Sequence, residues 1–90
     1  MKIAVRYMAQ LRQAAGVAAE EIELDSPASL ADLVRLLVQR HADLGRLLLT
    51  GGGAPQPTLL VFVGDEQADV GRSTLADGDA VTLLSPIAGG

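Results

Sequence analysis

Few residues of this 90-residue chain belong to the types that usually carry catalysis. It has one histidine, His41, and no cysteine, which excludes disulfide scaffolds, thiol nucleophiles and cysteine-based metal sites. A metal site would need carboxylates alone beside His41, and we expect this histidine to cap a helix end or to face solvent. No serine lies in a motif that supplies a histidine and an acid. We therefore expect no bound metal or cofactor and no catalytic residues of its own.

Acidic pairs and a glycine run are the other patterns that could indicate reaction chemistry. The acidic pairs are Glu20-Glu21, Asp65-Glu66 and Asp77 with Asp79. General acid–base catalysis needs two carboxylates in a shielded cleft, whereas these pairs fall in expected turns or on an exposed strand face, so we expect them to be solvated. Residues 51–53 are glycines followed by Ala54 and Pro55. Because a phosphate loop continues into a Lys-Ser/Thr pair, we expect a flexible loop here.

The feature that remains is the C-terminal sequence, which we expect to form a flexible tail over residues 85–90 after a domain of residues 1–84. Its residues are Ser85, Pro86, Ile87, Ala88, Gly89 and Gly90. Glycine leaves its carbonyl unshielded and adopts dihedral angles that other residues avoid. Such an arm can enter a narrow partner site and present the carboxyl group of Gly90, with Pro86 stiffening its root. The alternative is a frayed terminus without a function.

The hydropathy pattern predicts an α+β domain of two layers that would carry this tail. Alternating or continuous apolar residues predict strands over 2–8, 18–25, 58–63 and 80–84, with a short edge strand at 67–70. Helical spacing predicts one main helix over about 30–41, with Ser29 as N-cap and Asp32 in the first turn. This helix would cover one face of a mixed sheet of four to five strands. If the first and last strands lie side by side in the middle, the fold is a β-grasp, the ubiquitin-like fold.

Two shorter segments leave their structure open. Residues 9–15 are compatible with a helix, and residues 44–49 are apolar enough for a last helical turn or a buried segment. Residues 50–57 form a loop rich in glycine and proline.

Strand parity predicts an apolar patch on the sheet face that no helix covers. The inward set is Ile3, Val5, Tyr7, Leu59, Val61, Val63, Val81 and Leu83. The opposite face would show Ala4, Met8, Leu60, Phe62, Thr82 and Leu84. Because uncovered apolar patches commonly mark interaction sites, Met8, Leu60, Phe62 and Leu84 are our candidates for partner docking. The alternative is partial cover by residues 44–57.

Charge and hydropathy limit the classes of partner. The formal net charge is −4, which disfavours nucleic acid, since nucleic acid selects basic surfaces. The same acidic balance favours docking to a basic protein surface. No apolar run has the length of a membrane span and no signal peptide is evident, so we expect a cytoplasmic protein without a membrane partner.

Residues at both ends of the chain resemble the sulfur-carrier branch of the ubiquitin-like proteins. The terminal pattern reads Leu75-Ala76-Asp77-Gly78-Asp79-Ala80-Val81, then an apolar strand, Pro86, Ile87, Ala88 and Gly89-Gly90. The start, Tyr7-Met8-Ala9-Gln10-Leu11-Arg12 followed by Ala15-Gly16, resembles the small subunit of molybdopterin synthase. The chain departs from the common pattern at Gly64-Asp65, at Ser85 in place of a first proline, and at Leu83-Leu84 in place of phenylalanines.

This resemblance implies a mechanism in which the chain is a non-catalytic carrier and co-substrate. A ubiquitin-activating-type adenylyltransferase would use ATP and magnesium to adenylate Gly90, and sulfur would then displace AMP to leave a thiocarboxylate. The tail from Ser85 to Gly89 would enter the large subunit of molybdopterin synthase. Three alternatives remain: a sulfur carrier for cysteine or thiamine biosynthesis, a modifier that joins Gly90 to lysine, and a β-grasp binding module with an inert tail.

Overall fold

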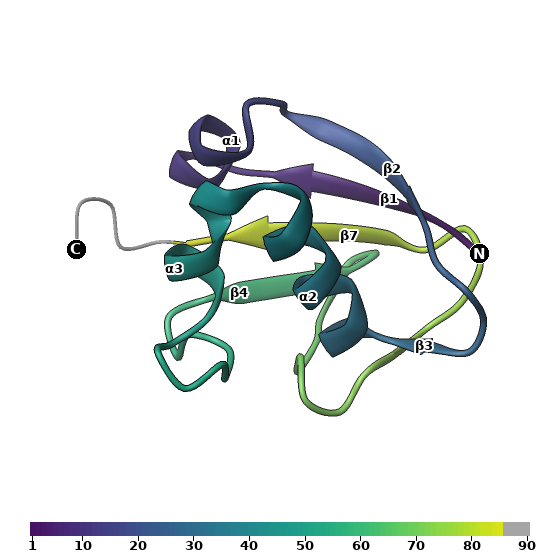
Figure 1. Cartoon of the computed structure of the whole chain (residues 1–90). Helices are drawn as coiled ribbons and strands as arrows, with labels where there is room; N and C mark the ends of the chain where they lie inside the picture. The colour runs from purple at the N-terminus through teal and green to yellow at the C-terminus, as the bar shows by residue number, and fades with distance from the viewer. Residues whose placement is uncertain (86–90) are drawn as a thin grey trace.

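The sheet has the strand order that the β-grasp interpretation requires. The structure, a computed structural model, describes residues 1–85. Its five-stranded sheet has the order β2-β1-β7-β4-β5, and Figure 1 shows β1 and β7 running side by side through the middle. The strands are β1 (Lys2–Tyr7), β2 (Ala19–Glu23), β4 (Leu60–Val63), β5 (Glu66–Gln67) and β7 (Ala80–Leu84). The predicted α+β class and the central first and last strands are therefore confirmed.

Two short strands were not predicted, and one predicted strand is misplaced. β3 (Ala28–Ser29) and β6 (Thr74–Leu75) pair antiparallel as a separate small sheet. Two residues are too few to show a period of two, so the sequence pattern contains no signal for them. The edge strand expected at 67–70 is β5 instead, and the apolar residue of that segment, Val70, is buried in the core.

In the described part of the chain, the helical residues form one main helix and three short pieces. They are α1 (Gln10–Ala15), α2 (Leu30–Arg40), a 3-10 turn η1 (Ala42–Leu44) and α3 (Gly45–Leu48). The backbone N–H of Asp32 donates to Ser29 Oγ at 3.1 Å, and Ser29 N–H donates to the Asp32 carboxylate at 2.9 Å. These two bonds form a capping box that starts α2 where predicted. Within residues 1–85, no helix is long and apolar enough to cross a membrane.

The core lies between α2 and one face of the sheet, as Figure 1 shows. Its fully buried members include Ile3, Val5, Tyr7, Val61, Val81 and Leu83 from the strands and Leu30, Leu33, Val34 and Leu37 from α2. Leu44 and Leu48 are also fully buried in this core. The apolar side chains of the 44–57 segment therefore turn towards the core, which argues against their covering the opposite face of the sheet. We call that opposite face the outer face.

Candidate functional site

The outer face brings together the four residues that strand parity nominated for docking. Leu60 pairs with Leu84, and Phe62 lies two residues further along the same strand. Met8 follows β1, and its N–H donates to the carbonyl of Leu83 at 3.1 Å. Leu60, Phe62 and Leu84 are half-buried, and Met8 is 40% exposed. The face is therefore apolar where β4 meets β7, close to the end of β7.

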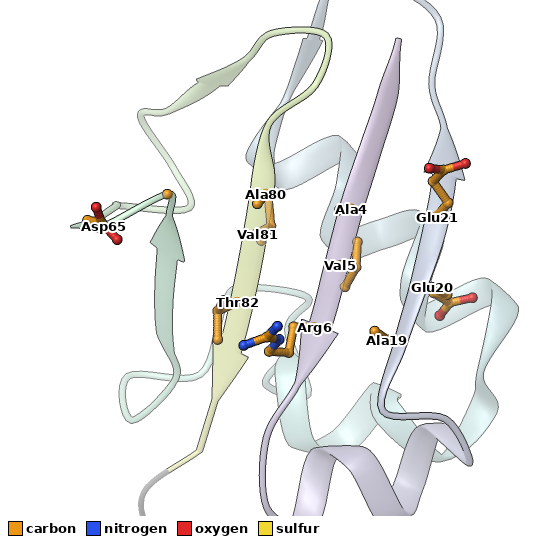
Figure 2. Close-up of a pocket in the computed structure, with 11 residues that line it drawn as sticks. Ala4, Val5, Arg6, Ala19, Glu20, Glu21, Asp65, Ala80, Val81 and Thr82 are labelled. Atoms are coloured by element: carbon orange, nitrogen blue, oxygen red, sulfur yellow. The ribbon is translucent and has the colours of Figure 1, made fainter.

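A shallow hollow of about 530 Å³ continues this face over β2, β1 and β7. The surface is recessed here because several of the lining side chains, those of Ala4, Ala19, Ala80 and Thr82, are short. Figure 2 shows the Arg6 side chain extending across β7 beside Thr82. Glu21 and Asp65 lie on opposite sides of the same hollow. The outer face thus combines an apolar part with a hollow that holds one exposed cation.

β7 ends beside the apolar part of the outer face, so the C-terminal segment begins there. Leu83 pairs with Tyr7 at the end of β1, so the exit lies beside the start of α1. Ser85, expected as the first tail residue, is only 8% exposed, and Gln10 Nε2 donates to its Oγ over 3.4 Å. The described fold therefore extends one residue past the expected boundary at Leu84. The other expected tail residues (Pro86, Ile87, Ala88 and Gly89) and the expected attachment residue Gly90 lie outside the described residues.

A polar cluster at the same end of the sheet corrects the expectation for Glu20 and one of the two alternatives for His41. Glu20 was expected to be solvated, and His41 either to cap a helix or to face solvent, but their side chains are only 12% and 17% exposed. Tyr7 Oη donates to Glu20 Oε2 at 2.5 Å, and His41 Nε2 lies 2.6 Å from the same oxygen. Arg40 Nε donates to Glu20 Oε1 at 2.9 Å. His41 does cap α2, as its N–H donates to the carbonyl of Leu37.

The electrostatics of this cluster keep Glu20 ionised. Burial by itself raises the pKa of Glu20, but hydrogen bonds from Tyr7 and His41 and the charges of His41 and Arg40 outweigh it and lower the pKa below 4.5. Burial raises the pKa of the Tyr7 hydroxyl, and its bond to Glu20 raises it further. Tyr7 therefore stays protonated and donates to the carboxylate. The cluster joins β1, β2 and the end of α2, which makes its role structural.

Glu20→Gln is expected to lower the free energy of unfolding by about 1–3 kcal/mol at pH 7, because it weakens hydrogen bonds to a charged, nearly buried acceptor. The folded-state pKa of Glu20 lies below its unfolded value. Its contribution is therefore complete above about pH 4.5 and is lost as the pH falls through the folded pKa. Urea denaturation across this range measures both effects. Glu21→Gln is the matched control, and an equal loss in that exposed neighbour would contradict the assignment.

Comparison with known proteins identifies the family. The sequence model of the ThiS family matches residues 5–90, which is nearly the whole chain. The chain belongs to the ThiS family. This ThiS-family chain is therefore a ubiquitin-like sulfur carrier, as its terminal residues suggested.

Within residues 1–85, no group of three or more His, Asp or Glu side chains is placed to hold a metal ion.

Individual relatives of the ThiS-family chain cover all or nearly all of its length. It is 29% identical over 92 residues to the molybdopterin synthase sulfur carrier subunit of Chlamydomonas reinhardtii, with all of both chains covered. A putative molybdopterin converting factor, subunit 1, from Pyrococcus furiosus is 30% identical with a TM-score of 0.76, covering 97% of this chain and 99% of that one. SAMP1 from Haloferax volcanii is 26% identical with a TM-score of 0.90 over the whole of both chains.

Other solved structures, less than 25% identical, share the fold of this ThiS-family chain. One is a complex of subunits 1 and 2 of the molybdopterin-converting factor from Helicobacter pylori, and another is CysO from Mycobacterium tuberculosis. The β-grasp fold is thus confirmed independently of the sequence pattern. The relatives are named for different roles, since one is a molybdopterin synthase sulfur carrier subunit and another a small archaeal modifier protein. Family membership alone therefore leaves the sulfur acceptor open.

Proposed function

We propose that this chain is the small subunit of a molybdopterin synthase, with a thiocarboxylate at Gly90 that donates sulfur to a pterin precursor. The observation that carries the proposal is the course of β7, a central strand that runs beside the uncovered apolar face and leads into the Gly-Gly sequence. Two relatives at 29% and 30% identity are named for molybdopterin biosynthesis. A carrier of this kind needs a docking face and a terminal carboxyl group, and no catalytic side chain.

The proposed chemistry proceeds in two displacements on a partner adenylyltransferase. The Gly90 carboxylate attacks the α-phosphorus of ATP, which with magnesium is a substrate of the partner, and pyrophosphate leaves. A hydrosulfide ion released by a donor then attacks the acyl carbon, AMP leaves with the bonding electron pair, and the thiocarboxylic acid formed loses its proton to solvent. The resulting thiocarboxylate is ionised at neutral pH and nucleophilic without a neighbouring base. Because ATP is consumed, the proposed location is cytoplasmic.

The described residues contribute docking rather than catalysis in this scheme. The apolar part of the outer face, formed by Leu60, Phe62 and Leu84, would hold the carrier against the adenylyltransferase and then against the large synthase subunit. Full burial of an exposed side chain of this kind contributes about 1.5–3 kcal/mol, and these half-buried side chains would contribute the part of it that remains exposed. Ser85, held near Gln10, would set the direction in which the tail departs.

Intact-mass spectrometry tests the proposed activation. The chain is incubated with the adenylyltransferase of its source organism, ATP, magnesium and a sulfur donor, and the expected product has one oxygen replaced by sulfur. Deletion of Gly90 is expected to abolish this product, because the arm becomes shorter by about 3.5 Å. Gly51→Ala is the matched control, since a Cβ at this loop glycine meets nothing within 4 Å. An unchanged mass for the wild-type chain would overturn the proposal.

A second candidate, a protein modifier, is favoured by the full-length likeness to SAMP1, which a second solved structure names small archaeal modifier protein 1. Isopeptide-linked adducts of Gly90 on lysines of other proteins would support it. A carrier for cysteine or thiamine biosynthesis shares the activation step. Co-purification of a larger pterin-binding subunit would support the molybdopterin role over the modifier and over the carrier for cysteine or thiamine biosynthesis.

A further inference from the structure

The end of the domain from which the C-terminal segment departs is rich in arginine, although the whole chain carries a net charge of −4. Arg6 precedes Tyr7, whose partner across the sheet is Leu83. Arg12 lies on α1, the helix whose Gln10 contacts Ser85. Arg46 lies on α3, and α1 and α3 both pack against η1. Figure 1 shows α1, α3 and the end of β7 at the same side of the molecule.

These three arginines are available for a partner. Each is exposed, and none forms an ion pair with another residue among positions 1–85. Arg40 at the same end differs, because its Nε donates to Glu20. We call Arg6, Arg12 and Arg46 the arginine collar. Figure 2 shows Arg6 towards the end of β7 from which the chain leaves, with Glu21 and Asp65 further back along the sheet.

Acidic side chains gather at the opposite end of the sheet, where β1 begins. Asp77 accepts the backbone N–H of Lys2 at 2.7 Å, and Asp79 accepts that of Ala76 at 2.8 Å. Glu23 pairs with Lys2 across β1 and β2. Near the exit, the described acidic side chains are Glu20, which pairs with Arg40, and Asp43 on η1. Arg6, Arg12 and Arg46 outnumber them, so positive charge is in excess at this end.

We propose that the arginine collar binds an acidic rim of Asp and Glu side chains around the partner site that receives the C-terminal segment. This inference rests on the proposed function, in which a partner adenylyltransferase receives Gly90. Salt screens charges beyond about 8 Å at physiological ionic strength, so the side chains beside the exit decide which surface is attracted there. Arginine pairs with carboxylates through two parallel hydrogen bonds, which also fixes orientation. The basic partner surface expected from net charge alone is the opposite of this proposal.

Charge reversal tests the collar. Arg12→Glu and Arg46→Glu are compared with Arg72→Glu, an exposed arginine in the loop before β6 that forms no ion pair within the described part of the chain. All three change the net charge equally, so only position differs. The measurement is ATP–pyrophosphate exchange by the adenylyltransferase of the source organism, as a function of carrier and salt concentration. Thermal unfolding of each variant checks that it is folded.

The collar variants are expected to raise the KM for the carrier about 3- to 10-fold, to leave kcat unchanged and to weaken the salt dependence. Arg72→Glu is expected to leave KM close to that of the wild-type chain. An equal rise for Arg72→Glu, or a lower KM for the collar variants, would overturn the proposal.

A binding experiment separates failure of the collar from failure of the proposed function. If the wild-type chain supports no exchange, the proposed activation fails and the collar is judged with a short peptide of alternating Glu and Leu. Amide chemical shifts are expected to change at residues 6, 12 and 46, to diminish in Arg12→Glu and to persist in Arg72→Glu. Shift changes that avoid these residues would show that the collar does not recognise acidic chains.

Discussion

Leu83→Ala is expected to lower the free energy of unfolding by about 2–5 kcal/mol, the cost of emptying a buried leucine site that cannot fully collapse. Leu83 is fully buried on the central strand β7, between its partners Tyr7 on β1 and Val61 on β4. A domain of this size has a total stability of about 5–13 kcal/mol, so the loss is a large fraction. Urea denaturation and the Tm measure it, with a fall in Tm of about 4–8 °C for each kcal/mol.

Leu84→Ala is the matched control for that prediction. It removes the same atoms from the adjacent residue of β7, whose side chain lies half-buried on the outer face. Its stability cost is expected to stay below that of Leu83→Ala by at least about 1 kcal/mol, because part of the side chain already contacts water. Equal losses for the two variants would contradict the assignment of core and outer face.

Phe62→Asp is expected to weaken docking of the carrier to its adenylyltransferase by a factor of about 100 or more. Phe62 lies half-buried at the apolar part of the outer face, next to Thr82 in the register. A carboxylate there would lose its hydration against an apolar partner surface. A factor of 100 corresponds to about 2.8 kcal/mol, within the range of interface hot spots. Isothermal titration calorimetry and the KM for the carrier measure the effect.

Val17→Asp is the control for docking. Val17 is 40% exposed like Met8, but it lies in the connection between α1 and β2, outside the four docking candidates. Its binding constant is expected to remain near that of the wild-type chain. If Phe62→Asp binds as tightly as Val17→Asp and both are folded, the outer face is not the docking surface.

The elements that were predicted correctly are those whose signal is local. A period of two marked β1 and β7, and helical spacing with Ser29 and Asp32 marked the start of α2. β3 and β6 were not predicted, because their pairing joins two-residue segments that lie far apart in the chain. Such pairing depends on the rest of the fold and has no local period.

For Glu20 in the polar cluster, strand parity predicted an inward side chain, but the acidic sequence around it led us to expect a solvated one. Glu20 shares the parity of Ile22, which faces the core, so alternation placed it inward with Tyr7. Its acidic neighbour Glu21 favoured a solvated interpretation of the pair. The approach of His41 to the same carboxylate joins positions 21 residues apart and follows from the docking of α2 on the sheet. Burial of that pair could not be predicted from either residue alone.

The sequence by itself determined the strand and helix pattern, the face to which each strand residue points and the residues that end in Gly-Gly, because these depend on local spacing and order. Only the tertiary structure decided that Ser85 packs against α1, that Glu20 is nearly buried and that the elements carrying the arginine collar lie at the same side of the molecule as the end of β7. Net charge is a sum that ignores position. A partner responds to charges within about a Debye length of its surface, and the fold alone places those.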